Sequence, residues 1–71
     1  MYRHIKQAHE ELKQGETIKI VYNNNYDTYL NRTDKVCSDG RLIKVERKNG
    51  AKVYINPRQI VFFCIIEKMW R

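Results

Sequence analysis

Residues 60–66, Ile60-Val61-Phe62-Phe63-Cys64-Ile65-Ile66, form an unbroken apolar run in a chain that is otherwise polar and basic. A strand with one wet face alternates apolar and polar residues, so a run without alternation is expected to be covered on both faces. A chain of 71 residues has little material with which to cover them. The run therefore predicts either a small closed barrel capped by a helix, or a strand buried against another copy or a partner.

The length of the chain indicates a single small domain. Such a domain buries only roughly 60% of the surface of its unfolded chain, so its core supplies a few kcal/mol at most. The two cysteines, Cys37 and Cys64, allow one disulfide at most. No stretch resembles a signal peptide, and seven apolar residues are far fewer than the roughly 20 that span a bilayer as a helix. We expect a cytoplasmic protein with reduced cysteines, no membrane partner, and stability gained by homo-oligomerisation.

The net charge of +6 lies mostly in the second half of the chain. Residues 1–35 carry six Lys and Arg against five Asp and Glu, or +1, whereas residues 36–71 carry eight against three, or +5. This asymmetry favours an anionic partner for the second half. The alternative is that the charge only keeps a small domain soluble.

The chain is predicted to begin with one helix and to continue as short strands. Residues 2–14 place Ile5, Ala8 and Leu12 at helical spacing, and Gly15 follows where a left-handed residue would end the helix. The thin apolar stripe predicts that the helix lies over an open end or face of the strands. Strands are predicted at about residues 17–22, 26–30, 42–47, 51–55 and 60–66, joined by turns at 23–25 and 38–41 and by a polar loop at 31–35, within one domain of residues 1–71.

The third and fourth strands are predicted to form a hairpin around residues 48–50, Lys-Asn-Gly. Asn-Gly suggests a two-residue turn, but that register would place Lys44 opposite Ile55 and so mix polar with apolar side chains. A three-residue loop with Gly50 in the left-handed position avoids this mixing. It pairs Val45 with Val53 and Ile43 with Ile55 on the inner face, and Glu46 with Lys52 and Lys44 with Tyr54 on the outer face.

The segment between the hairpin and the apolar run is predicted to be one tight turn. Pro57 lacks a donor and disfavours helix at Asn56, so the turn leads directly into the last strand. A helix followed by about five short antiparallel strands is the order of a small SH3-like barrel, and the predicted fold class is mainly β with an N-terminal helix. The expected core consists of Ile18, Ile20, Ile43, Val45, Val53, Ile55, Ile60 and Phe62.

This element order resembles that of the bacterial Sm-like RNA chaperones. Residues 53–61, Val-Tyr-Ile-Asn-Pro-Arg-Gln-Ile-Val, stand where that family has its second signature, and Tyr54 matches the tyrosine of the motif. Ile55-Asn56 replaces the family's Lys-His, and Asn23-Asn24-Asn25 replaces its paired glycines. The resemblance implies an Sm-like barrel, a ring oligomer and RNA as a partner.

No constellation of residues indicates an enzyme, a metal site or another cofactor. His4 and His9 are five residues apart and are not stacked on one helix face, so we interpret them as surface residues of the helix. The three glycines form no phosphate-binding loop, and no paired carboxylates have an apolar setting that would tune a general acid. We expect a non-catalytic binding protein.

Three groups of residues are candidates for binding. Basic residues beside an exposed aromatic can hold phosphates and stack a base, which predicts an RNA or DNA site. The alternative is that Tyr54 packs on Lys44 across the strands and the lysines only solvate this surface. Tyr26 and Tyr29, together with Tyr22, lie around the asparagines and suit a protein partner or a nucleotide; the alternative is that Tyr22 is a core residue and Tyr26 a strand residue. Trp70 is either an anchor for a partner or a lid on the barrel. The predicted nucleic-acid site consists of Arg41, Lys44, Arg47, Lys48, Lys52, Tyr54 and Arg58.

Two functions follow from these groups. The first is a nucleic-acid-binding regulator that uses the basic hairpin. The second is a protein-interaction or inhibitory module that binds its partner through the tyrosines around residues 23–25 or through the last strand. In this case the positive charge only speeds the encounter with the partner. Salt separates the two, because binding to phosphates weakens steeply as salt rises.

Overall fold

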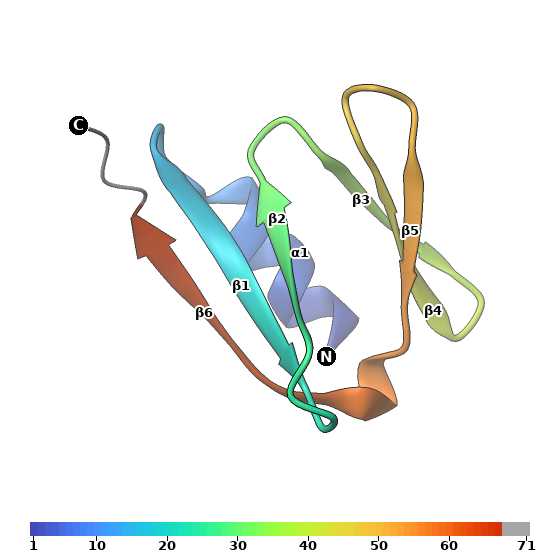
Figure 1. Ribbon diagram of the computed structural model, residues 1–71. Helices are drawn as coiled ribbons and strands as arrows, with labels where there is room; N and C mark the ends of the chain where they lie inside the picture. The colour runs from blue at the N-terminus through green and yellow to red at the C-terminus, as the bar shows by residue number, and fades with distance from the viewer. Residues whose placement is uncertain (68–71) are drawn as a thin grey trace.

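The computed structural model describes residues 1–67, in which one helix is followed by six strands (Figure 1). The strands form two antiparallel sheets, one in the order β2-β1-β6 and the other in the order β3-β4-β5. The predicted class, mainly β with an N-terminal helix, is confirmed. The elements are α1 (Tyr2–Glu10), β1 (Glu16–Tyr22), β2 (Asp27–Asn31), β3 (Lys35–Asp39), β4 (Leu42–Glu46), β5 (Lys52–Ile55), the 3₁₀ turn η1 (Pro57–Gln59) and β6 (Ile60–Glu67).

The strand β3 was not predicted. The expected polar loop at 31–35 is only a tight turn, closed by the Asp34 amide donating to the Asn31 carbonyl at 3.1 Å. The chain is extended again from Lys35, and Val36 is buried in the core. The polar segment 31–35 is thus a sharp bend that transfers the chain from one sheet to the other, and the strand count is six instead of five.

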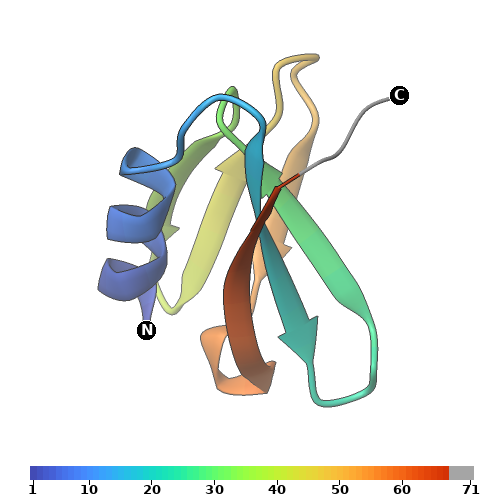
Figure 2. The ribbon, with the colours of Figure 1, turned by 90° about the vertical axis from the view of Figure 1, so that its left-hand side faces the viewer.

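The two sheets pack together without closing into a barrel. Within residues 1–67 no strand of one sheet pairs with a strand of the other, so the predicted closed barrel is not formed. Figures 1 and 2 show the sheets joined by the bend between β2 and β3 and by η1 between β5 and β6. As a result, β2 and β6 are the edges of one sheet and β3 and β5 are the edges of the other.

The helix is shorter than predicted. It ends at Glu10, and the amide of Leu12 bonds back only three residues, to the His9 carbonyl at 3.2 Å. Leu12 lies beyond the end of the helix but is still buried. The spacing of Leu12 from Ile5 and Ala8 therefore correctly indicates a buried residue, but it does not indicate that the helix continues to Leu12. Gly15, with φ of +89°, does not cap the helix; it lies in the turn that precedes β1, where the Glu16 amide donates to the Lys13 carbonyl.

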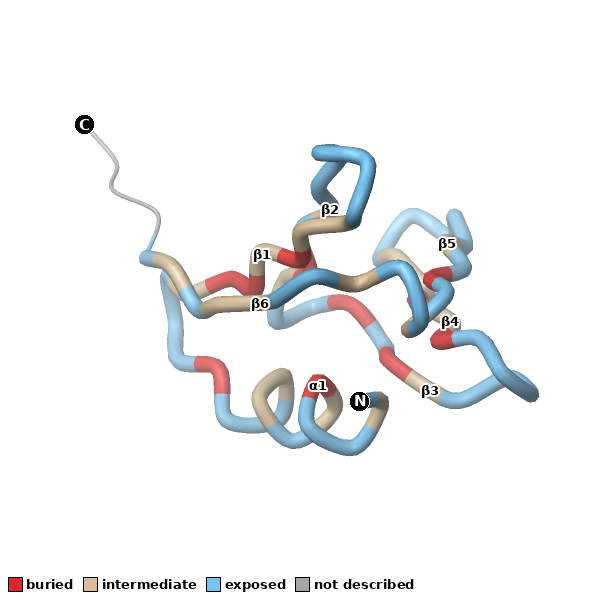
Figure 3. The backbone as a smooth tube through the Cα atoms, turned by 90° about the horizontal axis from the view of Figure 1, so that it is seen from below, coloured by how far each residue is buried: buried red, intermediate tan, exposed pale blue. Residues whose placement is uncertain are grey.

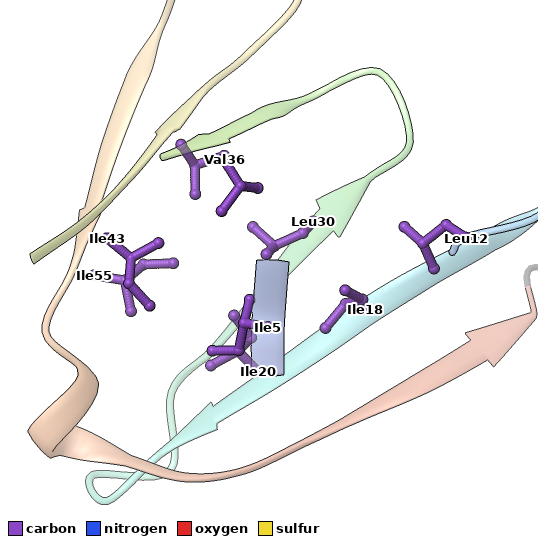
Figure 4. Close-up of a cluster of buried hydrophobic side chains, with 9 residues drawn as sticks. Ile5, Leu12, Ile18, Ile20, Leu30, Val36, Ile43 and Ile55 are labelled. Atoms are coloured by element: carbon purple, nitrogen blue, oxygen red, sulfur yellow. The ribbon is translucent and has the colours of Figure 1, made fainter. Parts of the chain in front are cut away.

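The core lies between the two sheets and α1. Figure 3 marks buried residues along strands of both sheets and in α1, where the buried residue is Ile5. In Figure 4, Ile5 of α1 lies beside Ile20 of β1, and Ile43 and Ile55 extend the cluster from the second sheet. Five of the predicted core residues are fully buried, and Val53 and Ile60 are partly buried against them. The buried apolar residues are Ile5, Leu12, Ile18, Ile20, Leu30, Val36, Ile43, Val45 and Ile55.

Phe62 is not a core residue, and a bulge in β6 explains why. Tyr22 pairs with Ile60 but Val21 pairs with Phe62, so Val61 is an extra residue that reverses the alternation. Phe62 therefore lies on the outer face and is 50% exposed, whereas Phe63 packs against the core. The expectation that both faces of the apolar run are covered is not met by this chain alone, because Val61 and Ile65 are exposed as well.

Candidate nucleic-acid interface

The β4–β5 hairpin has the predicted three-residue loop and register. The Arg47 amide donates to the Ala51 carbonyl at 2.7 Å, and Gly50 has φ of +92°, a conformation that favours glycine. Lys44 pairs with Tyr54, and Glu46 pairs with Lys52. Because paired residues share a face, Lys44 and Tyr54 lie side by side on the outer face of the sheet.

Tyr54 is accessible to a ligand. The residue is 50% exposed, and Lys44 and Cys37 continue its row across β4 and β3. The next row, Lys35–Glu46–Lys52, has one acid between two lysines. Apart from Glu46, this face therefore offers an aromatic ring flanked by positive charge, which suits a phosphate beside a base.

Arg47 is turned away from this face. Its guanidinium forms an ion pair with Asp34 and donates to the Tyr29 carbonyl at 2.8 Å. Asp34 is only 3% exposed at its side chain, and the same carboxylate oxygen accepts from the Asn31 amide at 2.8 Å. Arg47 thus connects the hairpin to the bend between β2 and β3, and its charge is compensated inside the molecule.

Arg41 and Arg58 come together around a cavity of about 610 Å³. Arg41 follows the β3–β4 turn at Gly40, and Arg58 lies in η1, whose first turn is capped by the Asn56 side chain accepting from the Arg58 amide at 3.0 Å. Among residues 1–67 neither arginine forms an ion pair, and the same holds for Lys44, Lys48 and Lys52. These five exposed or half-exposed cations are available for phosphates.

The tyrosines divide between two places. Tyr26, which is 71% exposed, and Tyr54 line one cavity of about 390 Å³, so residues that the sequence placed in separate groups share a site. Tyr29 does not line this cavity; it lies on the outer face of β2, opposite Lys19 of β1. Trp70 lies outside the described residues.

Sequence reasoning missed the polar lining of this cavity. Besides the tyrosines, it is lined by Asn24, Asn56, Gln59 and Asp27. The run Asn23-Asn24-Asn25 was interpreted only as a turn, which it is, with Asn25 at φ of +69°. The excess of amide side chains at two turns was the available signal, but nothing in the sequence shows that the two turns adjoin.

No group of three or more His, Cys, Asp or Glu in the described part of the chain could hold a metal ion, and Cys37 and Cys64 are free thiols. His9 Nε2 lies 2.9 Å from the Asn31 carbonyl oxygen, which gives this residue a structural role between α1 and β2. Within residues 1–67, no helix has the length and apolar character needed to cross a membrane.

Comparison with known proteins gives no match to a family model, a curated protein or a solved structure.

Proposed function

We propose that this chain is a small non-catalytic regulator that binds RNA or DNA through the outer face of the β4–β5 hairpin. The observation that carries the proposal is the pairing of Lys44 with a half-exposed Tyr54. A base stacks on the tyrosine ring while the neighbouring ammonium group contacts its phosphate. Lys48 and Lys52, at the loop and on the adjacent row, extend the positive surface along the hairpin.

Arg41 and Arg58 add a second set of phosphate contacts on the same half of the molecule. Both line the cavity that lies between the β3–β4 turn and η1. A strand of nucleic acid that crosses the hairpin can continue toward these arginines, since Asn56 lines both this cavity and the one beside Tyr54. The proposed phosphate ligands are therefore Arg41, Lys44, Lys48, Lys52 and Arg58, without Arg47.

The resemblance to bacterial Sm-like RNA chaperones supports the same proposal. It rests on the order of elements: a helix, short strands, and a tight turn leading into an Ile/Val-rich last strand. RNA is accordingly the first ligand to test, although the hairpin has no feature that selects RNA over DNA.

The test is binding of fluorescently labelled RNA and DNA oligonucleotides, followed by anisotropy over a range of salt concentrations. Changing Lys48 and Lys52 together to Gln is expected to weaken binding to all sequences alike and to flatten the salt slope by about one unit per lost contact. Tyr54→Ala is expected to cost about 1–3 kcal/mol with the slope unchanged, because stacking releases no counterions. Lys13→Gln, on the exposed connection between α1 and β1, is compared with Lys48→Gln alone, so that one charge is lost in each, and is the control for loss of charge.

A protein-interaction module is the second candidate function. It is favoured by the exposure of Val61, Phe62 and Ile65 on an edge strand, where a partner could cover them. If the chain shows no affinity for RNA or DNA at low salt, the nucleic-acid proposal is wrong and the protein-interaction module becomes the better proposal. Recovery of bound partners from cells, with and without nuclease, then identifies the class of partner.

A further inference from the structure

The cavity of about 390 Å³ lies where the β1–β2 turn meets the segment from β5 to η1. Its two exposed aromatic side chains, Tyr26 and Tyr54, come from segments that are distant in the sequence. Its volume lies in the lower part of the range of small-ligand sites, roughly 300–1,000 Å³. The cavity adjoins the basic face of the hairpin, because Tyr54 belongs to both.

Backbone hydrogen bonds hold the walls of the cavity in place. The Asn23 amide donates to the Gln59 carbonyl at 2.9 Å, which connects the β1–β2 turn to η1. The turn itself is closed by the Tyr22 amide donating to the Tyr26 carbonyl at 2.8 Å. The two aromatic residues are thus presented by segments that are fixed to each other, which lowers the entropy cost of binding between them.

The polar lining is suited to the edge of a planar heterocycle. The side-chain oxygen of Asn24 accepts a hydrogen bond from the Tyr26 amide, and that of Asn56 accepts one from the Arg58 amide. The side-chain NH₂ groups of both asparagines have no hydrogen-bond partner among residues 1–67 and are available to a ligand. Gln59 supplies a further amide, and Asp27, which is 4.0 Å from the Lys19 ammonium, supplies acceptors. Amide and carboxylate groups together can satisfy the donors and acceptors of a base.

We propose that this cavity takes one unpaired nucleobase, with Tyr26 and Tyr54 as its aromatic walls. The inference rests on the proposed function and deepens it, because it makes the ligand a single strand. The sugar-phosphate backbone stays outside, on the lysines of the hairpin, since Asp27 makes the cavity itself unfavourable for a phosphate. A duplex keeps its bases stacked inside and cannot place one here without unpairing it.

The test compares three probes of equal length in the nucleic acid, RNA or DNA, that binds in the salt titration. The first is a single strand with 2-aminopurine at one position, the second has abasic sites in place of its central bases, and the third is the duplex. The base-bearing strand is expected to bind at least about fivefold more tightly than the abasic strand, which has the same number of phosphates. It is also expected to bind more tightly than the duplex, and its 2-aminopurine fluorescence is expected to be quenched on binding.

Variants of the tyrosines test whether the difference in affinity between base-bearing and abasic strands arises from the cavity. Tyr26→Ala is expected to reduce the preference for the base-bearing strand, since only Tyr54 remains to stack on the base, and to leave the salt slope unchanged, whereas Tyr26→Phe retains the preference because it keeps the ring. Tyr29→Ala is the matched control, an exposed tyrosine of β2 that does not line the cavity. Tyr26 is largely exposed, so these changes are not expected to affect folding.

Failure of this inference is distinguishable from failure of the proposed function. If Tyr26→Ala has no more effect than Tyr29→Ala, the cavity is not a base site, while stacking on Tyr54 and phosphate binding by the hairpin stand. If abasic and base-bearing strands bind equally well, both the cavity and the stacking on Tyr54 are refuted, and only phosphate binding by the hairpin stands. If no probe binds at low salt, the proposed function is wrong and the inference is overturned with it.

Discussion

Arg47 differs from the other basic residues of the hairpin because its charge is used inside the molecule. The sequence grouped it with Lys48 and Lys52 as a phosphate ligand, since all three lie in one basic stretch. The structure pairs it with the buried Asp34 and with the Tyr29 carbonyl. Whether a surface arginine binds a ligand or a buried acid depends on contacts between distant segments, which a stretch of sequence does not contain.

Arg47→Gln is expected to destabilise the fold by up to about 3 kcal/mol. Removal of one partner leaves Asp34 buried with the Asn31 amide and without its cation, which is costly; the estimate is at the low end for buried pairs because Arg47 is 25% exposed at its side chain. Lys48→Gln removes the same charge from an exposed position and is expected to change stability by less than about 0.5 kcal/mol. Urea denaturation measures both, and equal stability of the two variants would contradict the role assigned to the ion pair.

The hairpin was predictable at the scale of the element because its residues alternate. Only one register places Ile43 opposite Ile55 and Val45 opposite Val53, and the structure has this register. The same alternation separates neighbouring residues of β4, so that Ile43 is fully buried whereas Leu42 is at the surface, 36% exposed.

Two substitutions in β4 test this assignment. Ile43→Ala is expected to cost about 2–5 kcal/mol, since it leaves a cavity in the core, and this is enough to unfold much of so small a domain. Leu42→Ala removes a similar side chain from the adjacent position and is expected to cost less than about 1 kcal/mol. Thermal unfolding followed by circular dichroism compares them; similar losses of stability would mean that the inner face of the hairpin is assigned wrongly.

Elements without alternation could not be predicted in the same detail. The bulge at Val61 is invisible in residues 60–66, because every residue of the run is apolar and either register satisfies the pattern. The run therefore predicts Phe62 as a core residue, whereas Phe63 is the phenylalanine that packs against the core. The strand β3 was missed because only Val36 is buried there, and the cavity between Tyr26 and Tyr54 was missed because it depends on how the two sheets pack.

At the scale of the whole molecule, two surfaces with different chemistry remain open. The hairpin and the β3–β4 turn present cations that form no ion pair within residues 1–67. The strand β6 pairs with β1 along one edge and presents exposed apolar side chains. An edge strand also has backbone amides and carbonyls that are free to pair with a further strand. Since a small domain gains stability by burying such a surface, β6 is the region where this chain is expected to associate with a second copy.

We predict a homo-oligomer, most simply a dimer, formed through β6. The two surfaces should respond to salt in opposite directions: salt weakens phosphate binding by the hairpin, but it favours the contact between copies, because it screens the repulsion between chains of net charge +6. Sedimentation at micromolar concentration and physiological ionic strength is expected to show a species heavier than 8.6 kDa. Phe62→Lys, which places a charge on the outer face of β6, is expected to return the chain to monomers, whereas Tyr29→Lys, on the far strand of the same sheet, is not. A monomer of the unmodified chain that persists as salt is raised would refute self-association and leave the exposed side chains of β6 to a different protein.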